Sequence, residues 1–389
     1  MSKYDYDLPF VEEEDDIVVL KHLCKHFPIK TNLFGKPIVS VKAVNDVSIK
    51  IKKGTTLGVV GESGCGKTTM GRTMLRLYDI TSGEIIYKGL NLDVLTTGQL
   101  RKLIPEGKEY DGARGGSREE LLETLNRTGI DINRVPRRAL TKLRPEIQII
   151  FQDPYSSLSP RMTIGSIIGE AVLEHKIVPK SEYRNYVIRI MKECGLQPYY
   201  FDRYPHEFSG GQRQRICIAR ALALNPKIVI CDEPVSALDV SIQAQIINLL
   251  KDLQEQHGIT YVFISHDLSV VKHISTDVAV MYLGSLMEKA PKEAIFDHPM
   301  HPYTKALLSA VPVPDPSVKM NRVILEGDIP SPANPPSGCK FHTRCKECME
   351  ICKKVEPRLV EYEPEHFVAC HLYGQSKTGK GDEKQENKG

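Results

Sequence analysis

Two patterns of hydrophobic residues alternate along most of this 389-residue chain. Short aliphatic and β-branched runs, typical of strands buried on both faces of a sheet, lie at 55–60, 147–151, 228–231 and 260–264. Longer stretches with apolar residues three or four positions apart predict amphipathic helices, and these lie at 67–77, 164–225 and 242–253. Strands that alternate with helices predict an α/β fold with a largely parallel sheet.

Residues 17–60 differ, because they read as successive strands joined by turns. Val47, Ile49 and Ile51 alternate with polar residues, which is the period of a strand with one buried face. The last run of this part ends directly at a glycine-rich loop, and a predicted helix follows the loop.

Three segments interrupt the pattern. Residues 93–146 are polar and charged, and they predict one short helix near 117–125. Prolines crowd the chain after about residue 311, which predicts a linker and a small irregular domain. Residues 374–389 contain almost no apolar side chains, so we expect this tail to be disordered.

Composition and charge exclude several classes of protein. Hydrophobic residues make up 41% and charged residues 26%, as in ordinary soluble proteins, and the net charge of +3 gives no field that favours nucleic acid. The acidic amino terminus lacks the apolar core of a signal peptide, and no run reaches the roughly 18 apolar residues of a membrane span. We therefore expect a cytosolic protein whose membrane role, if any, depends on a partner.

The glycine-rich loop carries the first candidate chemistry. Residues 61–68 read GESGCGKT, which matches the G-x-x-x-x-G-K-[ST] phosphate loop, and a strand and a helix flank it as that motif requires. Lys67 would reach the β- and γ-phosphates of ATP, and Thr68 would bind Mg²⁺. The expected nucleotide contacts are Gly61, Ser63, Gly64, Cys65, Gly66, Lys67, Thr68 and Thr69. The alternative is a glycine-rich turn without a ligand.

An acidic pair follows the strand-like run 228–231, at the end of a strand where parallel α/β sheets bind ligands. Asp232 would hold Mg²⁺, directly or through water, and Glu233 would act as the general base on the attacking water. Two adjacent acids at a strand end are otherwise often solvated turn residues.

A second loop, Ser209, Gly210, Gly211 and Gln212, precedes a helix and can offer N–H groups and a hydroxyl to phosphate. Here the sequence resembles the ATP-binding-cassette (ABC) ATPases, whose signature is LSGGQ, although Phe208 stands at the leucine position. The family's other elements follow in order along residues 17–290. They are Gln152 in the glutamine loop, Asp239 in the loop after the acidic pair, and His266 as the switch histidine.

The resemblance implies a P-loop NTPase core with an antiparallel β subdomain and a helical subdomain. It also implies a head-to-tail dimer in which Ser209 and Gly211 contact the γ-phosphate held by the other subunit. Asp239 would cross the interface, and Gln152 would link Mg²⁺ and the attacking water to the membrane partner. Phe27 is the candidate for stacking on adenine, with Phe34 as its rival.

Two stretches narrow the resemblance. His301-Pro302-Tyr303 and the later GDIPSPANPPSGC resemble the carboxy-terminal region of oligopeptide and dipeptide importer ATPases, and FQDPYSSLSPRMTIG resembles their F-type subunit. This implies a heterodimer with a paralogous ATPase at the cytoplasmic face of the membrane, two permeases and an extracytoplasmic binding protein. Nickel importers use similar ATPases. The implied domains are 17–290 with a long insertion at 93–146, then 291–373 with the cysteines, and the tail 374–389.

Five cysteines gather in the small terminal domain, at 339, 345, 348, 352 and 370. In relatives of this branch, Cys339, Cys345, Cys352 and Cys370 correspond to apparent ligands of a four-iron four-sulfur cluster. Zinc is an alternative, since Cys345 and Cys348 form one close pair, although structural zinc sites usually have two such pairs and no second pair follows. Free thiols that pack as small hydrophobic side chains are the other alternative.

Two other functions compete with an importer ATPase. A soluble cassette ATPase of ribosomes or DNA usually carries two cassettes or a long coiled coil, and this chain shows neither. A mainly regulatory subunit would not need intact Lys67, Asp232, Glu233, Gln152 and His266. The insertion at 93–146 is either a surface addition or a partner-contacting element.

Overall fold

The structure is a computed structural model that describes residues 8–31, 37–105, 107, 110–310 and 325–374. Two sheets organise these residues, a larger one with eight strands and a smaller one with four. None of the helices in this part of the chain combines the length and the apolar character of a membrane-spanning segment. The tail 375–389 and the candidate Phe34 lie outside the described residues.

The larger sheet has the strand order β11-β12-β10-β9-β3-β8-β7-β6. Its parallel part consists of β9 (Asp277–Tyr282), β3 (Thr56–Val60), β8 (Thr260–Ile264), β7 (Ile228–Asp232) and β6 (Ile147–Ile150). Four of these strands coincide with the apolar runs of the sequence. Strands β3, β7 and β8 are buried at every position, because helices or the second sheet cover both of their faces.

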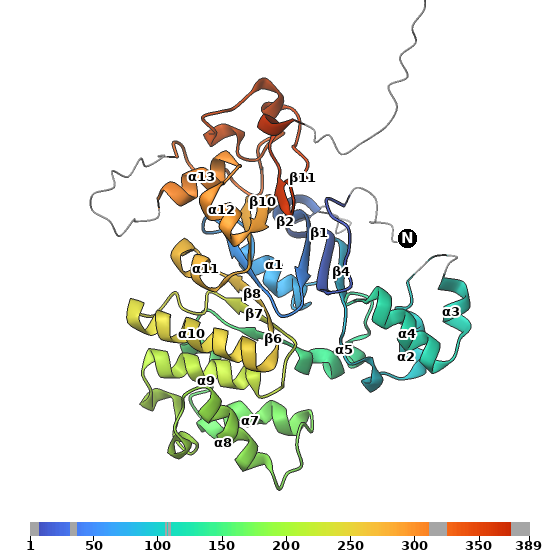
Figure 1. The fold of residues 1–389 in the computed structure, drawn as a ribbon, viewed down its shortest axis with the longest axis vertical. Helices are drawn as coiled ribbons and strands as arrows, with labels where there is room; N and C mark the ends of the chain where they lie inside the picture. The colour runs from blue at the N-terminus through green and yellow to red at the C-terminus, as the bar shows by residue number, and fades with distance from the viewer. Residues whose placement is uncertain (1–7, 32–36, 106, 108–109, 311–324, 375–389) are drawn as a thin grey trace, which may run out of the picture.

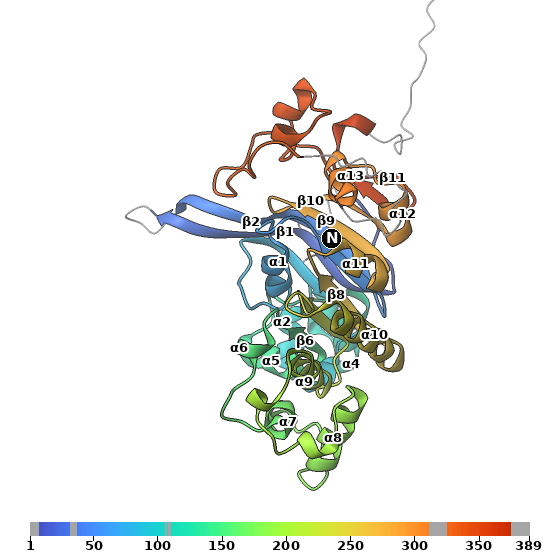
Figure 2. The ribbon, with the colours of Figure 1, turned by 90° about the vertical axis from the view of Figure 1, so that its left-hand side faces the viewer.

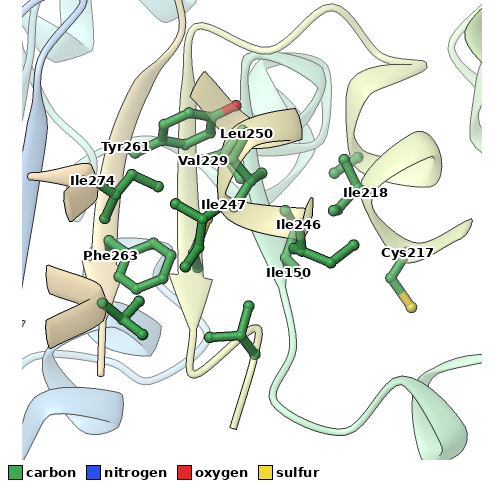
Figure 3. Packing of buried hydrophobic residues seen from close by; sticks show 14 of the residues in the cluster. Ile150, Cys217, Ile218, Val229, Ile246, Ile247, Leu250, Tyr261, Phe263 and Ile274 are labelled. Carbon is green, nitrogen blue, oxygen red and sulfur yellow. The ribbon is translucent and has the colours of Figure 1, made fainter. Parts of the chain in front are cut away.

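Alternate residues of the parallel strands enter two separate hydrophobic clusters. Val229, Tyr261 and Phe263 face a layer of helices, α9 (Gly210–Leu222), α10 (Val240–His257) and α11 (Leu268–Ile274) (Figure 3). Ile230 and Ile264 face the opposite way, toward α1 (Lys67–Met74) and the second sheet. Figure 2 shows α1 and α10 on opposite sides of the sheet.

The smaller sheet is antiparallel, in the order β2-β1-β4-β5. Its strands are β1 (Asp16–Thr31), β2 (Pro37–Lys52), β4 (Ser82–Tyr87) and β5 (Ile130–Asp131). The β1–β2 hairpin extends beyond the rest of the molecule in Figure 2. Ser48 and Lys50, which alternate with the buried aliphatic residues, are buried as well. Lys50 is covered because it pairs with Glu13 and with Glu365 of the carboxy-terminal region.

The insertion at 93–146 is more helical than the sequence predicts. The short helix expected near 117–125 is α4 (Arg118–Thr128), and three helices that were not expected accompany it, α2 (Thr97–Leu103), α3 (Asp111–Gly115) and α5 (Arg137–Leu143). Capping boxes at Thr96 and Ser117 begin α2 and α4, and their few buried leucines join the same cluster as β1. Helices α2 and α5 escape detection by periodicity because they present only two and three buried positions. Figure 1 shows α2, α3 and α4 grouped beside the antiparallel sheet.

The helical subdomain between β6 and β7 agrees with the periodic stretch 164–225. It consists mainly of α6 (Pro154–Ser157), α7 (Ile164–Glu174), α8 (Tyr183–Glu193) and α9, with short 3-10 turns between α8 and α9. In Figure 1 helices α7 and α8 lie at the end of the molecule opposite to the carboxy-terminal region.

The carboxy-terminal region begins with β10 (Ser285–Pro291), α12 (Lys292–Asp297) and α13 (Pro302–Ser309). It then adds the hairpin β11 (Val360–Glu363) and β12 (His366–Val368), and β12 pairs with β10 and so extends the larger sheet. This hairpin was not predicted, because its strands are short and partly charged. The division into domains at 290 and 373 stays a prediction.

Candidate functional site

The glycine-rich loop 61–68 connects the carboxyl end of β3 to the first turn of α1. Gly61 and Gly66 have positive φ angles, of 147° and 104°. A Cβ at Gly61 would lie 2.2 Å from the carbonyl oxygen of Met281, and one at Gly66 would lie 2.0 Å from that of Ala43. Both positions therefore require glycine, because the loop is pressed between β9 and β2. Ser63 and Gly64 are exposed at its turn, and Thr68 and Thr69 follow in α1.

Lys67 is buried and is held by the loop itself. Its ammonium group donates to the carbonyl oxygens of Gly61 at 2.7 Å and Glu62 at 3.1 Å, and it lies 3.8 Å from the Cys65 sulfur. Burial raises the pKa of the Cys65 thiol, so this residue packs as a small neutral side chain. The Lys67 ammonium group and the amino terminus of α1 therefore lie close together at one end of the sheet, and both favour a negatively charged ligand.

Asp232 ends β7 and is fully buried beside this loop. Its Oδ1 accepts a hydrogen bond from the Thr68 hydroxyl at 2.7 Å, and its Oδ2 lies 3.3 Å from Nη2 of Arg72. A buried carboxylate needs such partners, because an unpaired charge away from water is costly. The Thr68 hydroxyl and the Asp232 carboxylate, both predicted to bind Mg²⁺, are therefore in direct contact.

Glu233 follows Asp232 and turns in another direction. Its backbone has a φ of 49°, in the left-handed region, and its N–H donates to the carbonyl oxygen of Ile264. The carboxylate oxygen Oε2 accepts from Nε2 of Gln152 at 2.9 Å and lies 3.3 Å from Nδ1 of His266. An uncommon backbone conformation that aims a carboxylate at two polar side chains is typical of a functional site. The structure thereby brings together all three predicted catalytic residues.

The second loop lies on the other layer of the fold. Ser209 is the exposed N-cap of α9 and forms a capping box with Gln212, and Gly210 and Gly211 occupy the first turn. Helix α9 covers one face of the parallel sheet and α1 covers the other. Among the described residues, no hydrogen bond or ion pair joins this loop to the glycine-rich loop at 61–68.

Asp239 is exposed as the N-cap of α10, where it accepts from Ile242 N–H at 3.0 Å. A hydrogen bond from the Ser241 hydroxyl lowers the pKa of this carboxyl group. Phe27 lies half-buried on β1, with its ring edge-to-face on Tyr78 at 5.4 Å and the Lys25 ammonium 4.7 Å from its centre. One part of this ring is therefore covered by another aromatic side chain.

Comparison with known proteins shows which family this chain belongs to. The family described as ABC transporter matches residues 44–111 and 116–236, and the oligopeptide/dipeptide transporter carboxy-terminal region matches 287–352. The chain is 50% identical to the oligopeptide transport ATP-binding protein AppF of Bacillus subtilis (strain 168), over 92% of this chain and 98% of that protein. The chain belongs to the ATP-binding proteins of ABC transporters. It is therefore an ABC ATPase.

Other relatives agree. This ABC ATPase is 45% identical to the dipeptide transport ATP-binding protein DppF of Haemophilus influenzae, over 92% of this chain and 98% of that protein. The ATP-binding cassette MJ0796, solved as a dimer in a post-hydrolysis state bound to ADP and Pi, is 26% identical. It superposes with a TM-score of 0.54, over 71% of this chain and 99% of that one. The predicted fold class of the ABC ATPase is confirmed.

The cysteine cluster of the ABC ATPase surrounds one pocket. Its lining includes Cys339, Cys345, Cys352 and Cys370, and of the described cysteines in this region only Cys348 is not part of it. Burial raises the pKa of Cys339 to about 12, and the three neighbouring thiols act in the same direction. Four thiolates are the donor set of an iron–sulfur cluster. The described residues contain no group of three or more His, Cys, Asp or Glu that could hold a single metal ion.

The sequence did not reveal three contacts of the site. Arg72 reaches Asp232 from α1, and Glu62 of the glycine-rich loop contacts both Tyr303 and Arg344. Arg72 stands one helical turn after Thr68, and that spacing could have placed it on the same face of α1. No local signal could have found Arg344, which lies 282 positions from Glu62.

Proposed function

We propose that this ABC ATPase binds and hydrolyses ATP to power the uptake of oligopeptides or dipeptides across the cytoplasmic membrane. One observation carries the proposal. The glycine-rich loop after β3 meets the end of β7 where Thr68 contacts Asp232, in a chain half-identical to an oligopeptide transport ATP-binding protein. Carboxyl ends of parallel strands are where such sheets bind ligands.

The nucleotide would lie against the glycine-rich loop, with its phosphates facing the loop's N–H groups and the amino terminus of α1. Lys67 would exchange its bonds to the Gly61 and Glu62 carbonyls for the β- and γ-phosphates. Thr68, Asp232 and Gln152 supply the oxygens suited to Mg²⁺, and the 2.7 Å contact of the first two supports that assignment. When bound, Mg²⁺ neutralises phosphate charge. Phe27 would stack on adenine through the part of its ring that Tyr78 leaves uncovered.

Glu233 is the proposed general base. Its carboxylate is placed by Gln152 and His266 and by its own left-handed backbone, so it can accept a proton from the attacking water. His266 is more than half exposed, which leaves it free to contact the γ-phosphate when the site closes. Gln152 begins the segment that leads into the helical subdomain, so it can report the state of this site to a membrane partner.

The second loop would serve a different nucleotide. Helices α1 and α9 lie on opposite faces of the sheet, and Ser209, Gly210, Gly211 and Asp239 are not part of the Lys67 site. Ser209, Gly210, Gly211 and Gln212 would therefore contact ATP held by a paralogous ATPase in a head-to-tail heterodimer, and Asp239 would cross the interface. Two permeases and an extracytoplasmic binding protein would complete the complex at the cytoplasmic face of the membrane, with no role for nucleic acid.

The carboxy-terminal pocket would hold a four-iron four-sulfur cluster on Cys339, Cys345, Cys352 and Cys370. The shared lining of one pocket by these four thiols supports the assignment. Such a cluster would tie together chain segments that carry little regular structure. Anaerobic purification with iron and sulfide analysis and a visible absorption spectrum tests the proposal. Loss of absorption on substitution of Cys345 but not of Cys348 is expected, and equal loss from both substitutions contradicts the ligand set.

Transport is tested by co-purification of the chain from membranes, followed by uptake assays in proteoliposomes that contain the recovered permeases and binding protein. Uptake of labelled di- and oligopeptides that needs ATP and disappears with Lys67→Ala supports the proposal. Uptake of nickel, with no peptide-stimulated ATP hydrolysis, would replace the peptide by a metal ion and overturn the substrate assignment.

A further inference from the structure

Glu62 is an acidic residue inside a loop that must bind a polyanion. It directly follows Gly61, and its backbone carbonyl accepts hydrogen bonds from Cys65 N–H and from the Lys67 ammonium. A free carboxylate at this position would repel the phosphates of a nucleotide, because like charges in a partly desolvated site interact strongly. Nucleotide binding at this loop therefore requires another group that neutralises the Glu62 carboxylate or turns it away from the phosphates.

Arg344, from the carboxy-terminal region, pairs with the Glu62 carboxylate. Its guanidinium forms two parallel contacts with the Glu62 carboxylate, Nη1 to Oε2 at 2.7 Å and Nη2 to Oε1 at 3.1 Å. The Arg344 side chain is only 7% exposed and that of Glu62 is 22% exposed. A bidentate pair shielded from water is stronger and more specific in geometry than an exposed one.

Tyr303 holds the backbone of the same residue. Its hydroxyl accepts the N–H of Glu62 at 2.9 Å, and the phenol is fully buried. Tyr303 packs on Tyr282 and Phe341, with ring centres 4.8 Å and 5.3 Å away. Phe341 stands three positions before Arg344, so one aromatic cluster fixes both groups that contact Glu62.

We propose that Arg344 and Tyr303 are positioning residues that hold Glu62, and so shape the phosphate loop for nucleotide binding. This rests on the proposed function, since it assumes that ATP binds at the Lys67 loop. The carboxy-terminal region then has a part in ATP binding, although it supplies no group that contacts the nucleotide. Arg344 neutralises the one carboxylate of the loop, and Tyr303 fixes the peptide group from which Lys67 must detach.

The inference is tested by titrating the full-length chain with a slowly hydrolysed ATP analogue in the presence of Mg²⁺. Arg344→Gln should raise the Kd about tenfold, within the usual range of coupling between sites, because the Glu62 carboxylate loses its partner. The double variant Glu62→Gln with Arg344→Gln should recover an affinity close to that of the original chain, because the repelling charge is gone. This recovery is the readout that a merely structural role for Arg344 would not give.

Tyr303→Phe keeps the size of the side chain and provides a second test if Arg344 variants fold poorly. It should raise the Kd about fivefold, since the Glu62 N–H loses its acceptor. Arg184→Gln serves as the matched control, because Arg184 also makes two contacts with a carboxylate, Asp202, but on the exposed surface of the helical subdomain. Its substitution should leave the Kd unchanged.

The outcomes separate the inference from the proposed function. Lys67→Ala should abolish binding of the analogue, and unchanged binding would overturn both the nucleotide site and the positioning role. Loss of binding in Lys67→Ala, together with an unchanged Kd in both Arg344→Gln and Tyr303→Phe, would overturn the positioning role alone. A raised Kd in Arg344→Gln that the double variant does not correct would also overturn it.

Discussion

At the scale of single residues, adjacent side chains in this ABC ATPase have very different surroundings. Asp232 is buried and bonded to Thr68 and Arg72, whereas Glu233 turns through a left-handed backbone toward Gln152 and His266. The peptide bond between them thus separates a group that can hold a cation from one that can accept a proton. Environment, more than residue type, divides these roles.

Glu233→Gln tests the proposed general base. The amide keeps the shape of the side chain but cannot accept a proton, so ATP hydrolysis by the assembled complex should fall at least about a hundredfold. ATP binding should persist, because Lys67, Thr68 and Asp232 are unchanged. Glu255→Gln, at an exposed position of α10, is the control and should hydrolyse ATP normally. Unchanged hydrolysis in Glu233→Gln would contradict the assignment.

His301 gives a prediction about pH. Burial lowers the pKa of His301 to about 4, while its Nδ1 accepts Tyr303 N–H at 3.0 Å at the start of α13. Between pH 6.5 and 4 the unfolded chain gains a proton at this residue that the folded chain does not. The free energy of unfolding should therefore fall by on the order of 3 kcal/mol as the pH falls through this window.

His301→Asn keeps a side-chain acceptor for the helix cap and removes the titration. Chemical denaturation at a series of pH values should show a flatter dependence for this variant between pH 6.5 and 4. His273→Asn, at an exposed position of α11, should keep the original slope. An equal slope in His301→Asn and the original chain would show that His301 does not titrate in this way.

At the scale of elements, the insertion at 93–146 is part of the hydrophobic core and not an addition to the surface. Leu121 and Leu125 of α4 are fully buried in the cluster that also contains β1 and α1. Charged residues cover the outer side of α4 and hide this face from an inspection of composition. The insertion therefore contributes to stability, whatever else its outer surface contacts.

Leu121→Ala should lower the free energy of unfolding by about 2–5 kcal/mol, because it leaves a cavity in a closely packed cluster. Denaturant unfolding followed by circular dichroism measures the change. Glu123→Ala lies on the exposed side of the same helix and should change the stability by less than about 0.5 kcal/mol. Similar, small effects of the two substitutions would mean that the insertion does not belong to the core.

At the scale of the whole molecule, the sheet separates two functional loops. The glycine-rich loop at 61–68 leads into α1 on one face, and the second loop, which begins at Ser209, leads into α9 on the other. The carboxy-terminal region adds β11 and β12 to the same sheet and contacts the phosphate loop through Glu62. This arrangement fits the proposals that the protein offers one half of each of two nucleotide sites and that its carboxy-terminal region supports the first of them.

Ser209→Arg tests this division. A long cation at the exposed N-cap of α9 should lower hydrolysis at the site shared with the partner about a hundredfold, as removal of a phosphate contact does elsewhere. The full-length chain alone should bind ATP as before. Ser181→Arg, at an exposed turn before α8, should leave both activities intact. Loss of ATP binding by the isolated Ser209→Arg chain would contradict the proposed geometry.

The sequence by itself determined four of the five parallel strands, the helices α1 and α10, and the residues at the ends of β3 and β7. Each of these depends on local patterns, namely runs of apolar residues, helical spacing, and glycines beside Lys67. Three short helices of the insertion, α2, α3 and α5, and the β11–β12 hairpin escaped prediction, because each buries too few residues to give a periodic signal.

Only the tertiary structure decided which distant groups meet. It joined Gln152 and His266 at Glu233, placed the helices that follow the glycine-rich loop and the Ser209 loop on opposite faces of one sheet, and paired Arg344 with Glu62 across 282 positions. Contacts of this kind depend on the order of strands in the sheet and on the packing of aromatic residues such as Tyr303. Neither leaves a trace in the local sequence, because the residues that make such contacts have ordinary neighbours along the chain.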